Sequence, residues 1–141
     1  MQLETNRLIM KTNIKFVDDK LYEKKMSGIG NILEIKPISI EDHGFGFYLK
    51  ENPDIQVCHI GIRTDRRLVE ISYGTAEDYR NNGYMKEAVP YAIRWIFENS
   101  SVNEIYGLIC ENDKSEKIIR NCGFELESQH VKEKWYVYRR K

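Results

Sequence analysis

The stretch that decides the fold is DYRNNGYMKEAVPYAIRWIFENS, residues 78–100. It places an arginine, a pair of asparagines and a glycine directly before a segment striped with apolar residues. These recur with the spacing of one face of an amphipathic helix: Met85, Ala88, Val89, Ala92, Ile93, Ile96 and Phe97. A proline inside a helix removes one backbone hydrogen bond, so we expect Pro90 to kink a single helix over residues 83–99 and not to divide it.

Extended segments flank this helix at residues 68–74 and 105–110. A strand, helix and strand connected in this way almost always form a right-handed crossover, in which the two strands are parallel. The helix then begins near the carboxyl end of the first strand, where ligands tend to bind in α/β sheets. The segment at residues 78–85 is therefore predicted to lie at a binding corner.

The middle of the chain has the pattern of an antiparallel meander. Its extended runs are residues 44–49, 56–63 and 68–74, and short segments with turn chemistry join them at 51–54 and 64–66. The other expected elements are a strand at 5–12, a short charged helix at 18–26, a break at 27–30, a second helix at 113–122 ended by Gly123, and strands at 124–128 and 134–139. The predicted fold class is α/β (α+β), as one domain over residues 1–141.

Composition excludes several classes of protein. Lysine plus arginine equal aspartate plus glutamate at 22 each, so no net charge draws the chain to nucleic acid or to an anionic membrane. No apolar run approaches the roughly 18 residues of a membrane span, and the N-terminus lacks a secretory pattern, so we expect a cytoplasmic protein. The cysteines and histidines have no disulfide or metal-ligand spacing, and we expect no metal site: Cys58, Cys110, Cys122, His43, His59 and His130.

The residues before the long helix suit a phosphate group. The first backbone N–H groups of a helix have no partner within it and can bind a phosphate. Gly83 lets the backbone approach closely or take a positive φ, and Arg80 adds a positive charge. An alternative remains at this point: Asn81 or Asn82 is only a helix cap and Gly83 only relieves a turn. The segment is neither a P-loop nor a dinucleotide-binding motif.

Four motifs follow one another along the chain: Glu70-Ile71-Ser72-Tyr73-Gly74, Tyr79-Arg80-Asn81-Asn82-Gly83-Tyr84, Glu111-Asn112-Asp113-Lys114-Ser115 and Asn121-Cys122-Gly123-Phe124. Together they resemble the GNAT superfamily of acetyl-CoA-dependent N-acetyltransferases. The opening Glu4-Thr5-Asn6-Arg7-Leu8-Ile9-Met10 is similar to the start of the family's ribosomal-protein N-acetyltransferase branch. The resemblance runs nearly end to end, and the motifs occur in the family's order.

This resemblance implies a mixed, mostly antiparallel sheet, flanked by helices and splayed between the strands at 68–74 and 105–110. The pantetheine arm of acetyl-CoA enters the splay, and its pyrophosphate lies on the loop made by Arg80, Asn81, Asn82, Gly83, Tyr84 and Met85. Met85 stands where the family usually has glycine or alanine, so its side chain must point away from the cofactor.

The same resemblance implies roles for other residues. Asn112 would contact the cofactor arm, and the Ser115 hydroxyl would lie near the cofactor thiol. The alternative interpretation is that Asn112 only caps a helix and that Ser115 only faces solvent. Ile119 stands where a tyrosine often reprotonates the thiolate, so Ser115 or water would serve as the acid. Amides of Ser72, Tyr73 and Gly74 would polarise the thioester carbonyl. Glu70 is the candidate base, and its alternative is a solvated strand glutamate.

The expected function is acetyl transfer from acetyl-CoA to a primary amine, either a protein N-terminus or a small molecule, by direct attack in a ternary complex. Alternatives are a CoA-binding module with little or no catalysis and a phosphate-binding interaction domain. The expected partners are acetyl-CoA and an amine, without nucleic acid or membrane, in a monomer or homodimer. The segment between the first strand and the meander, which would cover the acceptor site, is shorter than is usual in the family. Candidate residues for the acceptor cleft are Asp18, Asp19, Glu23 and Glu41, and the aromatic tail Trp135, Tyr136 and Tyr138.

Overall fold

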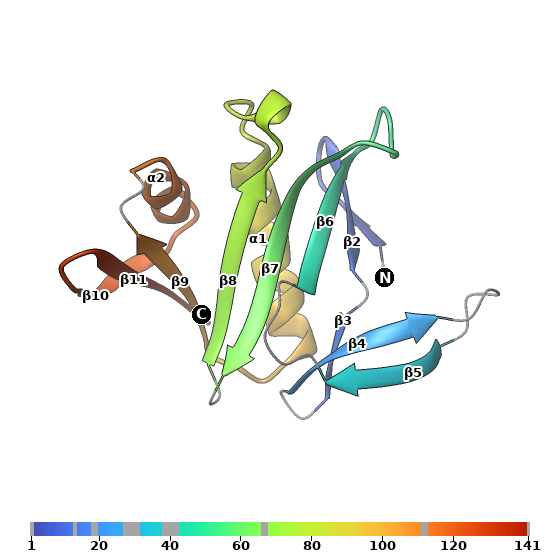
Figure 1. Ribbon diagram of the computed structural model, residues 1–141, viewed down its shortest axis with the longest axis horizontal. Coiled ribbons are helices and arrows are strands. Elements are labelled where there is room, and N and C mark those ends of the chain that lie inside the picture. The colour runs from blue at the N-terminus through green and yellow to red at the C-terminus, as the bar shows by residue number, and fades with distance from the viewer. Residues whose placement is uncertain are drawn as a thin grey trace.

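The computed structural model describes residues 2–12, 14–17, 20–26, 32–37, 43–65, 68–110 and 113–140 (Figure 1). Its strands are β1 (Gln2–Glu4), β2 (Leu8–Thr12), β3 (Ile14–Val17), β4 (Lys20–Met26), β5 (Ile32–Pro37), β6 (His43–Leu49), β7 (Gln56–Asp65), β8 (Leu68–Thr75), β9 (Glu104–Cys110), β10 (Glu125–Gln129) and β11 (Glu133–Arg139). Its helices are the short 3-10 helix Glu77–Tyr79, α1 (Tyr84–Asn99) and α2 (Asp113–Asn121).

The main sheet has the order β1-β2-β6-β7-β8-β9-β11-β10. Its neighbours are antiparallel except for β8 and β9, which are parallel. The predicted meander is β6, β7 and β8, and the predicted crossover runs from β8 through α1 to β9. Pro90 lies inside α1, which is one helix as expected. The expected mixed, mostly antiparallel sheet is thus confirmed.

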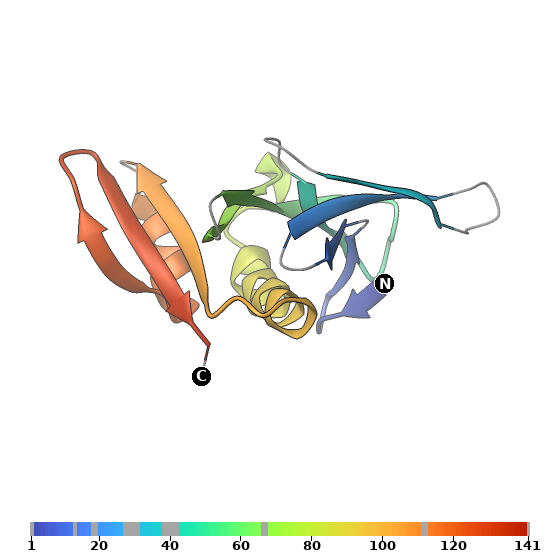
Figure 2. The same cartoon turned by 90° about the horizontal axis from the view of Figure 1, so that it is seen from below.

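The sheet splays between β8 and β9. Their pairing runs only from Val69 opposite Ile105 to Ile71 opposite Gly107, although β8 continues to Thr75 and β9 to Cys110. In Figure 2 the strands β9, β10 and β11 stand apart from β6, β7 and β8. The pairing of β8 with β9 therefore ends at Ile71, and the two strands diverge beyond it, as the family resemblance implied.

Strand alternation gives the main sheet one apolar and one polar face. On β7, the buried residues Cys58, Ile60 and Ile62 alternate with His59, Gly61 and Arg63. The apolar face packs on α1, where the ring of Phe45 meets Trp95 edge-on with centroids 5.2 Å apart. Figure 1 looks onto the opposite face, since α1 lies behind the strands. This arrangement leaves the polar face free of α1.

One predicted element is wrong. Residues 18–26 were expected to form a short charged helix, but residues 20–26 form β4, the middle strand of a second sheet with β3 and β5. Its register pairs residues of opposite charge, because Glu23 is the partner of Lys36 and Lys25 is the partner of Glu34. Cross-strand partners distant in the chain thus overrode a weak local helix preference. The expected break at 27–30 lies outside the described residues.

Candidate active site

The loop before α1 has a backbone suited to binding an anion. Asn81 has a φ of 65° and Gly83 a φ of 76°, both in the left-handed region. Gly83 is the N-cap residue of α1, and no side chain caps this end of the helix. The Asn82 amide nitrogen instead donates to the carbonyl oxygens of Tyr79 and Arg80 at 3.2 and 3.0 Å. The asparagine-cap alternative is therefore wrong, and the first-turn N–H groups have no side-chain acceptor.

Two side chains of this loop point in different directions. Arg80 is exposed, and its Nε atom donates to the carbonyl oxygen of Thr75 at 3.2 Å. Met85 is only 4% exposed and belongs to the hydrophobic core. The bulk of Met85 thus lies inside the protein, as expected, while its backbone belongs to the first turn of α1.

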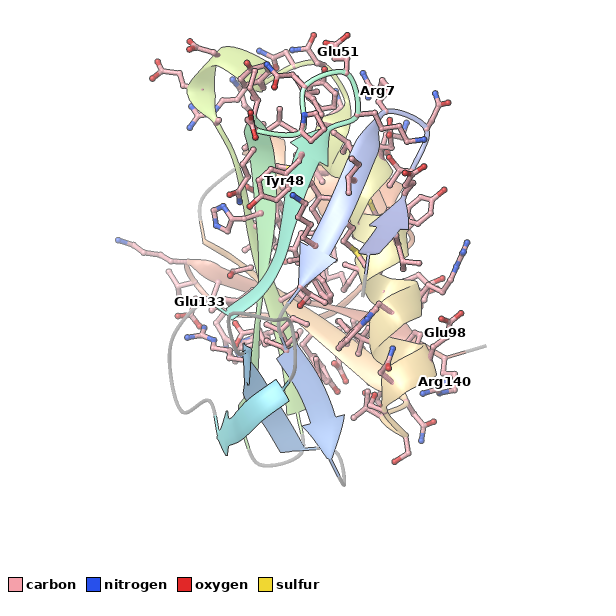
Figure 3. The ribbon with its side chains drawn as sticks, turned by 90° about the vertical axis from the view of Figure 1, so that its right-hand side faces the viewer. Arg7, Tyr48, Glu51, Glu98, Glu133 and Arg140 are labelled. Carbon is pink, nitrogen blue, oxygen red and sulfur yellow. The ribbon has the colours of Figure 1, made fainter. Side chains whose placement is uncertain are left out.

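A second arginine, which the sequence reasoning missed as a site residue, lies beside this loop. Arg7 donates from Nε to Glu87 Oε1 at 2.8 Å and from a terminal nitrogen to the carbonyl oxygen of Asn82 at 2.9 Å. Its guanidinium also lies 4.3 Å from the centroid of the Tyr84 ring. Figure 3 shows Arg7 at the same end of the sheet as Glu51. The signal that could have found it was the opening motif from Glu4 to Met10.

Glu87 connects the N-terminal segment to α1. It accepts hydrogen bonds from the Thr5 hydroxyl and, at 2.8 Å, from the backbone N–H of Arg7. Burial alone would raise the pKa of Glu87, but the hydrogen bonds from Thr5 and Arg7 and the charge of Arg7 outweigh burial and lower it. The loop before α1 is thus fixed from the side by an ionised carboxylate and its partners.

Tyr73 and Ser115 connect β8 to α2 across the splay. The Tyr73 hydroxyl donates to the backbone carbonyl oxygen of Ser115 at 2.6 Å. Burial is the largest cause of a raised pKa for Tyr73, so its hydroxyl stays protonated. The structure thus brings two predicted site residues together, although through the backbone of Ser115. Asn112 lies outside the described residues.

Ile119 is a core residue. It is 1% exposed, and a Cβ atom built on Gly107 would lie 2.3 Å from its Cδ1 atom. Gly107 therefore lets α2 pack closely on β9. Ile119, at the position where the family often has a tyrosine, thus packs its aliphatic side chain against Gly107.

Glu70 forms an ion pair on the polar face of the sheet. Arg63 donates from Nε to Glu70 Oε2 at 2.9 Å and from a terminal nitrogen to Oε1 at 3.0 Å. The side chain of Glu70 is 18% exposed and that of Arg63 is 53% exposed. Both carboxylate oxygens thus accept a hydrogen bond from Arg63, and each has a further lone pair.

A groove of about 560 Å³ lies on this polar face, and the sequence reasoning missed it. Side chains of Lys11, Tyr48, Gln56 and His59 line it, together with Gly44, Gly46 and Gly61. Figure 3 shows Tyr48 on the side of the sheet away from α1. Glycines take the outward positions of this face at Gly44, Gly46 and Gly61, and the side chains of Tyr48 and Gln56 lie close to Gly46. The alternating glycines at 44 and 46 were the signal for the groove.

The two cysteines whose side chains are described and the tail tyrosines are packed in or against the hydrophobic core. Burial is the largest cause that raises the pKa of the Cys58 thiol to about 12 and that of Cys122 to about 11, so neither is a reactive thiolate. Tyr136 is fully buried and its hydroxyl donates to Glu116 at 2.7 Å. The tail ring of Tyr138 packs on Phe97 and Phe124.

The expected acidic residues of the acceptor side fall outside the part of the chain whose side chains are described: Asp18, Asp19, Glu23 and Glu41. Within the described residues, no group of histidine, cysteine or carboxylate side chains is arranged to hold a metal ion. No helix in that part of the chain is long and apolar enough to cross a membrane.

Comparisons with known proteins agree with this geometry. The family model described as "Acetyltransferase (GNAT) domain" matches residues 18–125. No curated protein matches the sequence.

Three solved structures are similar to this one. A GNAT-family acetyltransferase from Bacillus anthracis is 17% identical with a TM-score of 0.67, and the match covers 99% of this chain and 98% of that one. Spermidine N-acetyltransferase from Vibrio cholerae, solved with CoA and spermine, is 16% identical with a TM-score of 0.61, over 70% and 65% of the two chains. Ribosomal-protein-S5-alanine acetyltransferase from Vibrio fischeri is 18% identical with a TM-score of 0.54, over 67% and 61%. At these identities the likeness shows the fold.

Proposed function

We propose a specific reaction for this chain, which belongs to the GNAT family and is an acetyl-CoA-dependent acetyltransferase. It moves the acetyl group of acetyl-CoA to a primary amine, by direct attack of the amine while both substrates are bound. The observation that carries the proposal is the start of α1, where a left-handed Gly83 and a helix end without a side-chain cap lie at the carboxyl end of β8.

The loop from Arg80 to Met85 is the proposed seat of the cofactor pyrophosphate. Backbone N–H groups at the start of α1 would bind the phosphate oxygens, and the helix dipole would favour their negative charge. The exposed Arg80 and the neighbouring Arg7 would add positive charge. Tyr84 stays on the loop under the Arg7 guanidinium. Asn81 and Asn82 shape the backbone through its left-handed turn and the Asn82 hydrogen bonds.

The splay is the proposed path of the pantetheine arm. Beyond Ile71 the backbone of β8 is no longer paired with β9, so amides of Ser72, Tyr73 and Gly74 are proposed to polarise the thioester carbonyl. Asn112 and Ser115 are proposed to hold the arm from the opposite side. The Tyr73 hydroxyl, now bonded to the Ser115 backbone, would keep the two sides at a fixed separation.

Proton transfer is proposed to involve Glu70 and Ser115. An amine attacks only when it is neutral, so Glu70 would take its proton, directly or through water, on a lone pair that Arg63 does not use. Ser115 or water would return a proton to the thiolate, since Ile119 is buried and has no acidic group. This aliphatic residue favours the second candidate function, a CoA-binding module with little catalysis.

The amine acceptor is supported by similar proteins. One of them is named a spermidine N-acetyltransferase and another a ribosomal-protein-S5-alanine acetyltransferase. We propose a single-domain cytoplasmic enzyme that acts as a monomer or homodimer, without nucleic acid, membrane or metal.

The test combines binding with turnover. Acetyl-CoA is expected to raise the melting temperature of the protein by several degrees, because it binds only the folded state. Inorganic phosphate alone is expected to leave the melting temperature unchanged. Release of the CoA thiol is then followed with a panel of amino acids, amino-acid amides, N-terminal peptides and polyamines. Turnover with at least one amine supports the proposal. Stabilisation by acetyl-CoA without turnover would favour the binding module, and no stabilisation would contradict both functions.

A further inference from the structure

The imidazole of His59 extends from β7 over the end of β8. His59 and Gly74 are cross-strand partners on the polar face of the sheet. A Cβ atom built on Gly74 would lie 2.8 Å from the imidazole Cε1 atom, 3.5 Å from Nε2 and 3.6 Å from Nδ1. The glycine therefore gives the ring its place. His59 is exposed, and among the described residues none forms a hydrogen bond with its side chain. One nitrogen of the neutral ring is thus free to accept a proton.

The residue before Gly74 directs its backbone N–H group to the splay. Ala76 donates from its N–H group to the carbonyl oxygen of Val57 at 2.8 Å. Hydrogen-bonded pairs alternate along an antiparallel ladder, so the N–H groups of Ser72 and Gly74 point to β7 and that of Tyr73 points away from it. Of the amides proposed to polarise the thioester, that of Tyr73 therefore faces the path of the cofactor.

An amine can reach a thioester at Tyr73 from the polar face. The Tyr73 side chain points to the opposite face, because its cross-strand partner Ile60 is buried there. Its hydroxyl donates to the carbonyl oxygen of Ser115 at 2.6 Å, which joins β8 to α2 on that face. The side of the splay that faces the helices is thus occupied, and the amine approaches from the side on which His59 lies.

His59 is closer to this position than Glu70 is. Glu70 precedes Tyr73 by three residues, roughly 10 Å at about 3.3 Å per residue, whereas the imidazole lies over the residue that follows Tyr73. The cross-strand pair between the imidazole and Glu70 is Gly61 with Ser72, whose side chains are absent or small. A primary amine therefore has room between the imidazole and the carboxylate.

We propose that His59 is a catalytic residue of the acetyl transfer, and that it takes a proton from the amine nitrogen as the carbon–nitrogen bond forms. This inference rests on the proposed function and adds a second proton acceptor to it. An ammonium group must lose two protons to become an amide, and Glu70 accounts for one. Imidazoles change charge near neutral pH, which suits a general base better than a carboxylate does.

The protons and electrons balance in this scheme. The bound ammonium gives its first proton to Glu70 through water. The nitrogen lone pair then forms a bond to the acetyl carbonyl carbon, and His59 takes the second proton from nitrogen. The carbon–sulfur bond breaks, its electron pair leaves on the CoA sulfur, and the sulfur takes a proton from Ser115 or water. Glu70 and His59 return their protons to water, so the products are the amide, the CoA thiol and one proton.

Few charges face His59. Among the residues with described side chains on β2, β6, β7 and β8, the charged ones on this face are Lys11, Arg63 and Glu70. Lys11 is two strands away, and its Nζ atom lies 4.4 Å from the centroid of the Tyr48 ring. Arg63 and Glu70 form an ion pair with each other. The titration of His59 is therefore expected to govern the pH dependence of this step.

The experiment compares the wild-type protein with His59→Gln across pH. Thiol release is measured at saturating acetyl-CoA and amine, with the best acceptor of the panel described above. An imidazole accepts a proton only when it is neutral, so the advantage of the wild type is present at high pH and is lost as the pH falls. The kcat of His59→Gln should be about 100-fold lower than that of the wild type near pH 8, and less than about tenfold lower near pH 5.

His130→Gln is the matched control, because His130 is an exposed histidine between β10 and β11. Its kcat should equal that of the wild type at every pH. An unchanged melting-temperature shift with acetyl-CoA shows that each variant is folded and binds the cofactor. A kcat of His59→Gln within about threefold of the wild type, or lower by one constant factor at every pH, overturns the inference and leaves the proposed function standing. No turnover of any amine by the wild type contradicts the proposed function, and this inference with it.

Discussion

Gly83 is the residue on which the proposed phosphate seat depends most directly. Its φ of 76° is unfavourable for any residue with a Cβ atom, and most for a β-branched one. Its Cβ position has open space, with Arg7 at 3.6 Å as the nearest neighbour. Substitution there therefore acts through the backbone and not through a steric clash with the core.

Gly83→Val is expected to lose acetyl-CoA binding while the protein stays folded. The backbone must either leave the left-handed region or bear a strain of about 1–2 kcal/mol, and either change disturbs the N–H groups of the first turn. Thermal unfolding with and without acetyl-CoA measures both effects. Gly83→Asn is the matched control, because asparagine tolerates the left-handed region and should retain most of the shift. Equal binding by the valine variant would refute this placement of the pyrophosphate.

At the scale of elements, the first strands and α1 are joined through Glu87. Its side chain is 16% exposed, and Arg7 and Thr5 donate to it from the turn between β1 and β2. The pKa of Glu87 is lowered in the folded protein. The stability that this group contributes is therefore present above the pKa of the unfolded state, 4.5, and is lost as the pH falls through the folded-state pKa.

Glu87→Gln is expected to destabilise the protein more at neutral pH than in acid. The variant lacks the ionised carboxylate at every pH, whereas the wild type loses it only on acidification. Urea unfolding at about pH 7 and about pH 3 should show the difference between the two proteins shrinking. Glu98→Gln, on the exposed part of α1, is the control and should show no such change. A constant difference for Glu87→Gln would mean that the ion pair contributes nothing.

At the scale of the whole molecule, local patterns predicted much of the fold. The apolar spacing from Met85 to Phe97 located α1, and the turns at 51–54 located the meander. The family resemblance implied the splay. The failure at residues 20–26 is physical: those residues have no strong preference of their own, and their strand pairs with β3 and β5 decide their state.

The candidate site likewise has a part that the sequence predicted and a part that it did not. The loop from Arg80 to Met85 is contiguous in sequence, so a motif could reveal it. The contact of Arg7 with Asn82 joins residues 75 positions apart, and the groove needs three strands in register. The opening motif and the alternating glycines point to these residues, but the contacts between them depend on strand pairing and not on neighbours in the sequence. The partner of Glu70 is closer in the sequence, since Arg63 lies only 7 positions before it, on the neighbouring strand β7.

Hydrogen exchange with and without acetyl-CoA tests the central claim, the position of the cofactor, most directly. We predict slower exchange in peptides that cover residues 72–75 and 81–87, because bound phosphate and thioester groups accept from their backbone N–H groups. The second sheet, β3 to β5, should be unchanged and serves as the internal control. Protection that is absent from residues 81–87, or that is centred on the second sheet, would contradict the account.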